Sequence, residues 1–126
     1  MKNILKTFWA IALILGFAVQ SFAQDSIRTP LALGKIEPYK MEVTYDKTSH
    51  LIFPTAIRYV DLGSEYLIAG KAEDAENVLR VKATVRDFEP ETNFSVITND
   101  GRFHSFNVSY SSYPEAMSYD LLTMQK

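Results

Sequence analysis

The stretch FSVITNDGRFHSFNVSY, residues 94–110, decides the fold of this chain. Apolar and polar residues alternate on both sides of the dipeptide Asp100-Gly101. A period of two residues is typical of a strand with one buried and one solvated face. The residues expected on the buried face are Phe94, Val96 and Thr98 before the turn, and His104, Phe106, Val108 and Tyr110 after it. Because Asp and Gly tolerate the positive φ of a tight turn, the stretch predicts a β-hairpin.

Short alternating runs also occupy the rest of residues 39–113. Strands are predicted at residues 39–45, 50–53, 57–61, 65–69 and 79–85. In the last of these we expect Leu79, Val81, Ala83 and Val85 to face inward, with the positive side chains Arg80, Lys82 and Arg86 on the outer face. Residues 71–77 have the composition for only about one helical turn, so we expect a solvated loop there.

About seven short strands without a long helical period favour an all-β fold, an immunoglobulin-like antiparallel β-sandwich over residues 39–113. A small closed barrel is the alternative, because periodicity determines faces but not strand order. The chain contains no cysteine, so packing alone must hold this domain together. We therefore expect that a charge placed at Val81 or Phe106 abolishes folding.

Residues 1–23 have the pattern of a secretory signal peptide. A positively charged start precedes the apolar run of residues 8–19, and Ser21 and Ala23 are the small residues that a signal peptidase reads. We expect a signal peptide helix that is cleaved near Ala23, and export to the periplasm or the outer membrane. An uncleaved anchor is the alternative, although a spanning helix needs about 20 apolar residues.

Residues 24–38 lack a clean period and contain Pro30 and Pro38, so they predict an extended arm. Such an arm would be able to add as a strand to a neighbouring protein. Beyond residue 23, the remaining 11 of the 13 basic residues stand against all 15 acidic ones, a net charge of −4. This balance argues against direct nucleic-acid binding, which needs a basic stripe to displace counterions from phosphates.

The chain offers few residues for catalysis or metal binding. Its two histidines, His50 and His104, have no partner at metal-ligand spacing and are interpreted as structural or surface residues. His104, Ser105 and Asp100 supply the three residue types of a hydrolase triad. On a strand, however, His104 and Ser105 point to opposite faces.

Carboxylates gather in two apparent loops, where solvation is the expected role. They are Glu89 and Glu91 around Pro90, and Glu73, Asp74 and Glu76. A glycosidase needs two carboxyl groups across a cleft, one of them desolvated. We predict no catalytic, cofactor-binding or metal-binding residue and no enzymatic activity.

Tyrosine is the most conspicuous side chain of residues 24–126. The seven tyrosines are Tyr39, Tyr45, Tyr59, Tyr66, Tyr110, Tyr113 and Tyr119. Tyr110 and Tyr113 enclose Ser111-Ser112, and Tyr with Ser makes an adaptable recognition surface. The favoured interpretation is that strand tyrosines bury their rings and keep the hydroxyl at the rim.

Residues 29–116 closely resemble the N-terminal portion of the conjugative transposon protein TraN family. The segments that carry the resemblance are HLIFPTAIRYVDLGS (residues 50–64), NVLRVKA (residues 77–83) and TNFSVITNDGRFHSFNV (residues 92–108). The resemblance implies an exported structural component of a conjugative DNA-transfer apparatus, a type IV secretion machine. The family is distantly similar to β-sandwich subunits of the secretion channel's outer core, and it carries over no catalytic residue.

The resemblance also implies the partners. They would be other transfer proteins of the channel, in an oligomeric assembly whose membrane association comes only through the complex. An exported sandwich that binds glycans or peptides through its tyrosines is the alternative function, and a small hydrolase is third. Members of the family continue into a second β-rich domain, so residues 114–126 are expected to be a truncated linker or the start of that domain.

Overall fold

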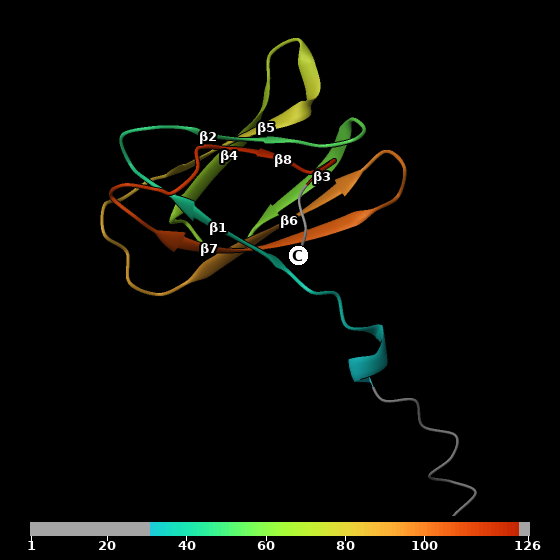
Figure 1. Ribbon diagram of the computed structural model, residues 1–126, viewed down its shortest axis with the longest axis horizontal. Helices are drawn as coiled ribbons and strands as arrows, with labels where there is room; N and C mark the ends of the chain where they lie inside the picture. Colours follow the sequence, from blue (N-terminus) through green and yellow to red (C-terminus); the bar gives the residue numbers. More distant parts are fainter. Residues whose placement is uncertain (1–30, 124–126) are drawn as a thin grey trace, which may run out of the picture. The chain divides into compact units, whose positions relative to one another are not determined.

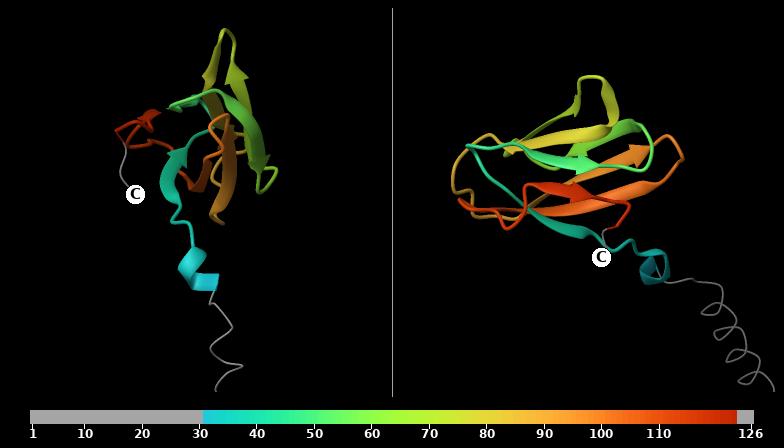
Figure 2. Two further views of the ribbon diagram at one scale, coloured as in Figure 1. Left: turned by 90° about the vertical axis from the view of Figure 1, so that its right-hand side faces the viewer. Right: turned by 45° about the horizontal axis from the view of Figure 1, so that its top comes forward.

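The computed structural model describes residues 31–123, and these form an all-β fold (Figure 1). The strands of the described residues are β1 (Tyr39–Val43), β2 (Ser49–Ile52), β3 (Ile57–Leu62), β4 (Leu67–Ala72), β5 (Ala75–Ala83), β6 (Thr92–Thr98), β7 (Phe103–Tyr110) and β8 (Ser118–Asp120). They make two four-stranded sheets, of order β1-β7-β6-β3 and β4-β5-β2-β8. Figure 2 shows the two layers from two further sides.

The predicted β-sandwich is confirmed, and the closed barrel is not formed. The orders β7-β6-β3 and β4-β5-β2 correspond to the G-F-C and D-E-B strands of an immunoglobulin-like sandwich. Eight strands occur in residues 31–123 where about seven were expected. Two of the pairings, β1 with β7 and β2 with β8, are parallel rather than antiparallel. Both join segments far apart in the chain, which no local turn signal predicts.

The hairpin of residues 94–110 forms as predicted, by β6 and β7. Gly101 N donates to Thr98 O at 2.9 Å, and Thr98 N donates to Arg102 O at 3.1 Å. Gly101 has a φ of +81°, so the turn is a three-residue loop that ends in a left-handed glycine. Phe94 and Phe106 are paired across the strands, and their rings stack with centroids 4.5 Å apart.

The core lies between the sheets and contains most of the apolar residues that the alternation predicts, together with Phe88 and Leu121, which lie outside the predicted strands. The buried apolar residues are Met41, Val43, Leu51, Phe53, Ile57, Leu67, Leu79, Val81, Ala83, Phe88, Phe94, Val96, Phe106, Val108 and Leu121. Val85 is a correction, because it was expected inside and is 43% exposed. β5 ends at Ala83, so the alternation does not extend to Val85.

Residues 71–77 are the second correction. They are not a solvated loop but the end of β4, a turn at Glu73 and Asp74, and the start of β5, and this hairpin projects from the sandwich in Figure 1. Asp74 takes a left-handed φ of 63° at this turn, a conformation that Asp tolerates better than most residues. The strand before it begins at Leu67 rather than Glu65.

The tail contributes a strand to the sandwich. Residues 114–126 were expected to be a truncated linker or the start of a second domain, and within them Ser118–Asp120 forms β8 beside β2. His50 N donates to Met117 O at 2.9 Å, and Leu121 N donates to Ile52 O at 3.0 Å. Leu121 is only 8% exposed. The sandwich therefore extends past residue 113, because an apolar side chain in the tail has a place in the core.

The N-terminal predictions are only partly within the described residues. The signal peptide and its cleavage near Ala23 lie outside them, as do residues 24–30 of the expected arm. Leu31–Gly34 is not extended but forms a 3-10 turn, η1, in a unit separate from the one that begins at Ile36. Leu and Ala favour helical geometry and Gly ends it. Within residues 31–123 there is no helix long and apolar enough to cross a membrane.

Candidate functional site: the Tyr45 surface

The residue types of a hydrolase triad are not assembled into one. His104 is 8% exposed and lies on the core-facing side of β7, whereas the adjacent Ser105 lies on the other side. This is the separation that the two-residue period predicts. The Thr98 hydroxyl is one partner of His104, and it lies 3.4 Å from Nε2.

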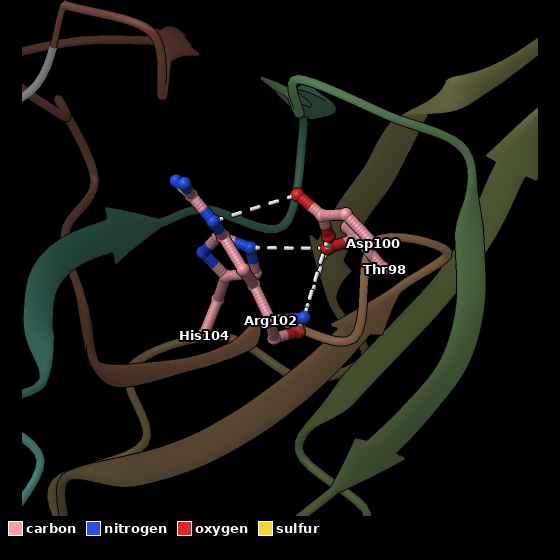
Figure 3. Close-up of polar contacts among 4 residues, drawn as sticks. All are labelled: Thr98, Asp100, Arg102 and His104. Atoms are coloured by element: carbon pink, nitrogen blue, oxygen red, sulfur yellow. Dashed lines mark hydrogen bonds and ion pairs between the residues drawn. The ribbon is translucent and has the colours of Figure 1, made fainter.

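A polar network surrounds this pair at the β6–β7 turn (Figure 3). Thr98 Oγ1 donates to Asp100 Oδ1 at 2.5 Å, and Arg102 N donates to the same oxygen at 3.3 Å. Arg102 Nε lies 3.5 Å from Asp100 Oδ2. The Thr98 hydrogen bond is the main cause that lowers the pKa of Asp100, and the Arg102 backbone and charge add to it.

This network has a structural role, because it fixes the β6–β7 turn against the core. The Thr98 side chain is fully buried, and its proton is directed to Asp100. His104 Nε2 must therefore be the donor in its contact with Thr98. The imidazole also packs edge-on against Phe53, with ring centroids 5.1 Å apart. These contacts join the turn to the core, and the buried hydroxyl is not presented to a substrate.

The carboxylates singled out in the sequence are all solvent-exposed. Glu89 and Glu91 lie in the connection before β6, and Glu73, Asp74 and Glu76 lie at the β4–β5 turn. Within residues 31–123, no group of three or more His, Cys, Asp and Glu residues is arranged to hold a metal ion. His50 is half-buried on β2, opposite Arg80.

The seven tyrosines divide into a packed set and an exposed set. Tyr39, Tyr66, Tyr110 and Tyr119 are partly buried against the core. Tyr66 stacks on Phe88 with centroids 5.1 Å apart, and burial raises the pKa of Tyr119. Tyr45, Tyr59 and Tyr113 are exposed, at 37%, 51% and 91%. The interpretation that strand tyrosines bury their rings therefore holds for the four packed tyrosines. The three exposed tyrosines are accessible to other molecules.

Tyr45 is the centre of a surface built from residues far apart in sequence. Arg86 Cζ lies 4.5 Å from the centroid of the Tyr45 ring, and Lys82 Nζ lies 5.3 Å from it. Both distances are those of cation–π contacts. Arg86 also pairs with Asp46 through two hydrogen bonds of 2.8 and 2.7 Å. This pairing lowers the pKa of Asp46 and raises that of Arg86.

A groove of about 290 Å³ continues from this cluster toward the predicted Tyr–Ser patch. Its lining residues are Thr44, Asp46, Lys47, Arg86, Tyr110, Ser112 and Tyr113. We refer to this lining together with Tyr45 and Lys82 as the Tyr45 surface. Its aromatic rings, paired guanidinium and hydroxyl groups are suited to recognition of another molecule, since Tyr and Arg dominate binding energy at protein interfaces.

The sequence pointed to only one side of this surface. The Tyr110–Tyr113 stretch was recognised as a candidate patch, whereas Tyr45, Asp46 and Arg86 were not connected with it. Arg86 and Asp46 are 40 residues apart. The sequence did place Arg86 on the outer face of its predicted strand. It did not show that Tyr45 and Asp46 lie beside Arg86, because that depends on which turn packs next to β5.

Residues 41–114 match the family described as Domain of unknown function (DUF8473). The chain belongs to the DUF8473 family. The DUF8473 match begins within β1 and ends after Tyr113, so it spans the Tyr45 surface and stops before β8. No curated protein matches the chain.

Proposed function

We propose that this DUF8473 protein is a non-enzymatic assembly component of a conjugative type IV secretion apparatus, exported to the periplasm and acting through protein–protein contacts. The resemblance of residues 29–116 to the TraN family supports the conjugative setting. A β-sandwich is also the fold that this resemblance implies, and the all-β structure is compatible with it.

The observation that carries the contact role is the Tyr45 surface. Tyr113 is 91% exposed beside the groove, and the Tyr45 ring lies within cation–π distance of both Arg86 and Lys82. The pairing with Asp46 orients the Arg86 guanidinium in the free protein. Arg86 therefore loses less side-chain entropy when a partner binds. Rigid aromatic residues with an adjacent arginine are typical centres of protein interfaces.

Mating frequency tests the proposal. A donor strain that lacks the gene is complemented with the wild-type protein, with the double variant Tyr45→Ala/Tyr113→Ala, or with the control Tyr59→Ala, which changes an exposed tyrosine on β3. We expect the deletion to abolish transfer and the double variant to lower it about tenfold or more, because each truncated anchor costs more than 1 kcal/mol. The control should transfer at the wild-type level.

Co-purification with the other transfer proteins separates assembly from a general growth defect. The double variant should lose these proteins from the eluate while its own abundance, measured by immunoblot, stays unchanged. Unimpaired transfer in the deletion strain would disprove the conjugative role.

An exported binding module for glycans or peptides is the second candidate. The groove between Tyr110 and Tyr113 favours it, because it brings hydroxyl groups and a ring together around Ser112. The packed rings of Tyr39, Tyr66 and Tyr119 favour the assembly role instead. Glycan-array binding that is lost in Tyr113→Ala, together with normal mating, would support the second candidate over the first.

A further inference from the structure

A second groove lies on the outer face of the β4-β5-β2 part of the sandwich. It has a volume of about 310 Å³ and is lined by Thr48, Ile68, Ala69, Gly70, Arg80 and Lys82. Strand register explains this composition, because Ile68 is paired with Lys82 and Gly70 with Arg80. Apolar and cationic side chains therefore alternate across two adjacent strands, and we call this region the β4–β5 groove.

Gly70 leaves open space in the groove. A Cβ atom added at Gly70 would meet no heavy atom within 4 Å. Ile68, on the same strand, is 58% exposed. Its side chain therefore forms an accessible apolar wall of the groove. An aliphatic side chain of a bound molecule fits above Gly70 and against Ile68.

The charge of the groove is opposite to that of the chain beyond residue 23. Arg80 and Lys82 are the ionisable residues of the lining, which contains no carboxylate. In residues 24–126, by contrast, 15 acidic residues outnumber the basic ones. A local concentration of positive charge on an otherwise acidic surface selects acidic partners and steers them toward it.

The groove also borders a sheet edge. Among the described residues, β4 is the outermost strand of its sheet and pairs with β5. An edge strand offers unpaired backbone groups to an extended peptide, and alternate side chains of that peptide then face the same side. A nucleic acid or a polysaccharide has no peptide backbone with which to extend the sheet as a further strand.

We infer that the β4–β5 groove binds an acidic, extended peptide segment of a partner protein, with carboxylates at Arg80 and Lys82 and an aliphatic side chain over Gly70. Lys82 borders both this groove and the Tyr45 surface, whereas Arg80, Ile68 and Gly70 belong to this groove alone. The test below uses purified protein, so its outcome does not depend on the conjugative role.

Fluorescence anisotropy with a labelled peptide that alternates glutamate and valine measures this binding. We expect saturable binding that weakens with salt. Gly70→Leu should weaken it about tenfold, because the new side chain fills the groove in open space. Arg80→Glu should weaken it at least as much, since like charges then face each other. The control Arg58→Glu, an exposed residue on β3, should leave it unchanged.

Two further ligands test whether the groove prefers an acidic peptide to other molecules. A peptide that alternates lysine and valine should not bind, and a single-stranded oligonucleotide should bind more weakly than the acidic peptide. Circular dichroism checks that each variant is folded. The inference is overturned if the acidic peptide does not bind, if the oligonucleotide binds more tightly, or if Gly70→Leu and Arg58→Glu have equal effects.

Discussion

Phe106→Ala tests whether facing aromatic rings hold the two sheets together. The Phe106 side chain is fully buried. Its ring centroid lies 4.5 Å from that of Phe94, 5.4 Å from that of Tyr39 and 6.1 Å from that of Phe53. It therefore contacts both neighbouring strands of its sheet and the segment that follows β2. Its removal leaves a cavity that none of these well-packed rings can fill without moving.

The magnitude follows from this burial. Truncating a buried Phe to Ala costs about 3 to 5 kcal/mol, including the cavity. Domains of this size have about 5 to 15 kcal/mol of unfolding free energy in total. With a urea m-value of about 1.5 kcal/mol/M, the unfolding midpoint should fall by about 2 to 3 M.

Urea titration followed by far-UV circular dichroism measures this shift, and Phe103→Ala is the matched control. Phe103 is on the same strand but is 44% exposed, so its truncation should cost about 1 kcal/mol or less. Equal midpoints for the two variants would refute the assigned core and the faces of β7.

Three further outcomes are expected. Leu121→Ala should lower the unfolding free energy by about 2 to 3 kcal/mol, whereas Leu122→Ala, at a position 68% exposed, should leave it nearly unchanged. Equal effects of the two variants in urea titration would show that the tail does not pack into the core. Gly101→Ala should destabilise by about 1 kcal/mol in the same assay, because Ala is strained at a φ of +81°. Thr98→Val should raise the pKa of Asp100 toward its ordinary value, as an NMR titration of the carboxyl carbon would show. The lowered pKa of Asp100 stabilises the fold at pH values above the ordinary pKa of Asp, and this contribution is lost as the pH falls through the lowered pKa. Wild type should therefore lose more stability than Thr98→Val on acidification. An Asp100 pKa that is the same in both proteins would contradict the hydrogen bond.

Much of the fold was predictable from local pattern. The hairpin of residues 94–110 and the inward faces of β5, β6 and β7 follow from alternation and from one Asp-Gly turn. The opposite faces of His104 and Ser105 follow from the same rule. Val85 was predicted wrongly although it continues the alternation, because β5 ends at Ala83. Other segments were missed because their pattern is short. Residues 71–77 have no alternation to distinguish a hairpin turn from a loop, and β8 has only three residues.

The candidate site was predictable only in part, for a different reason. The Tyr110–Tyr113 stretch is contiguous, so composition alone indicates it. Tyr45 and Asp46 reach Arg86 only because the connection after β1 lies beside the end of β5. The β4–β5 groove likewise requires the register that sets Gly70 opposite Arg80.

The sequence by itself determined which side chains turn inward, since a period of two residues assigns each residue to one face of its strand whatever its neighbours are. The tertiary structure decided which strands became neighbours, including the parallel pairings of β1 with β7 and β2 with β8. Strand order depends on contacts between residues distant along the chain, whose closure costs entropy that only the completed core repays. The surfaces proposed to bind other molecules are made by that order, and so they became visible only in the folded protein.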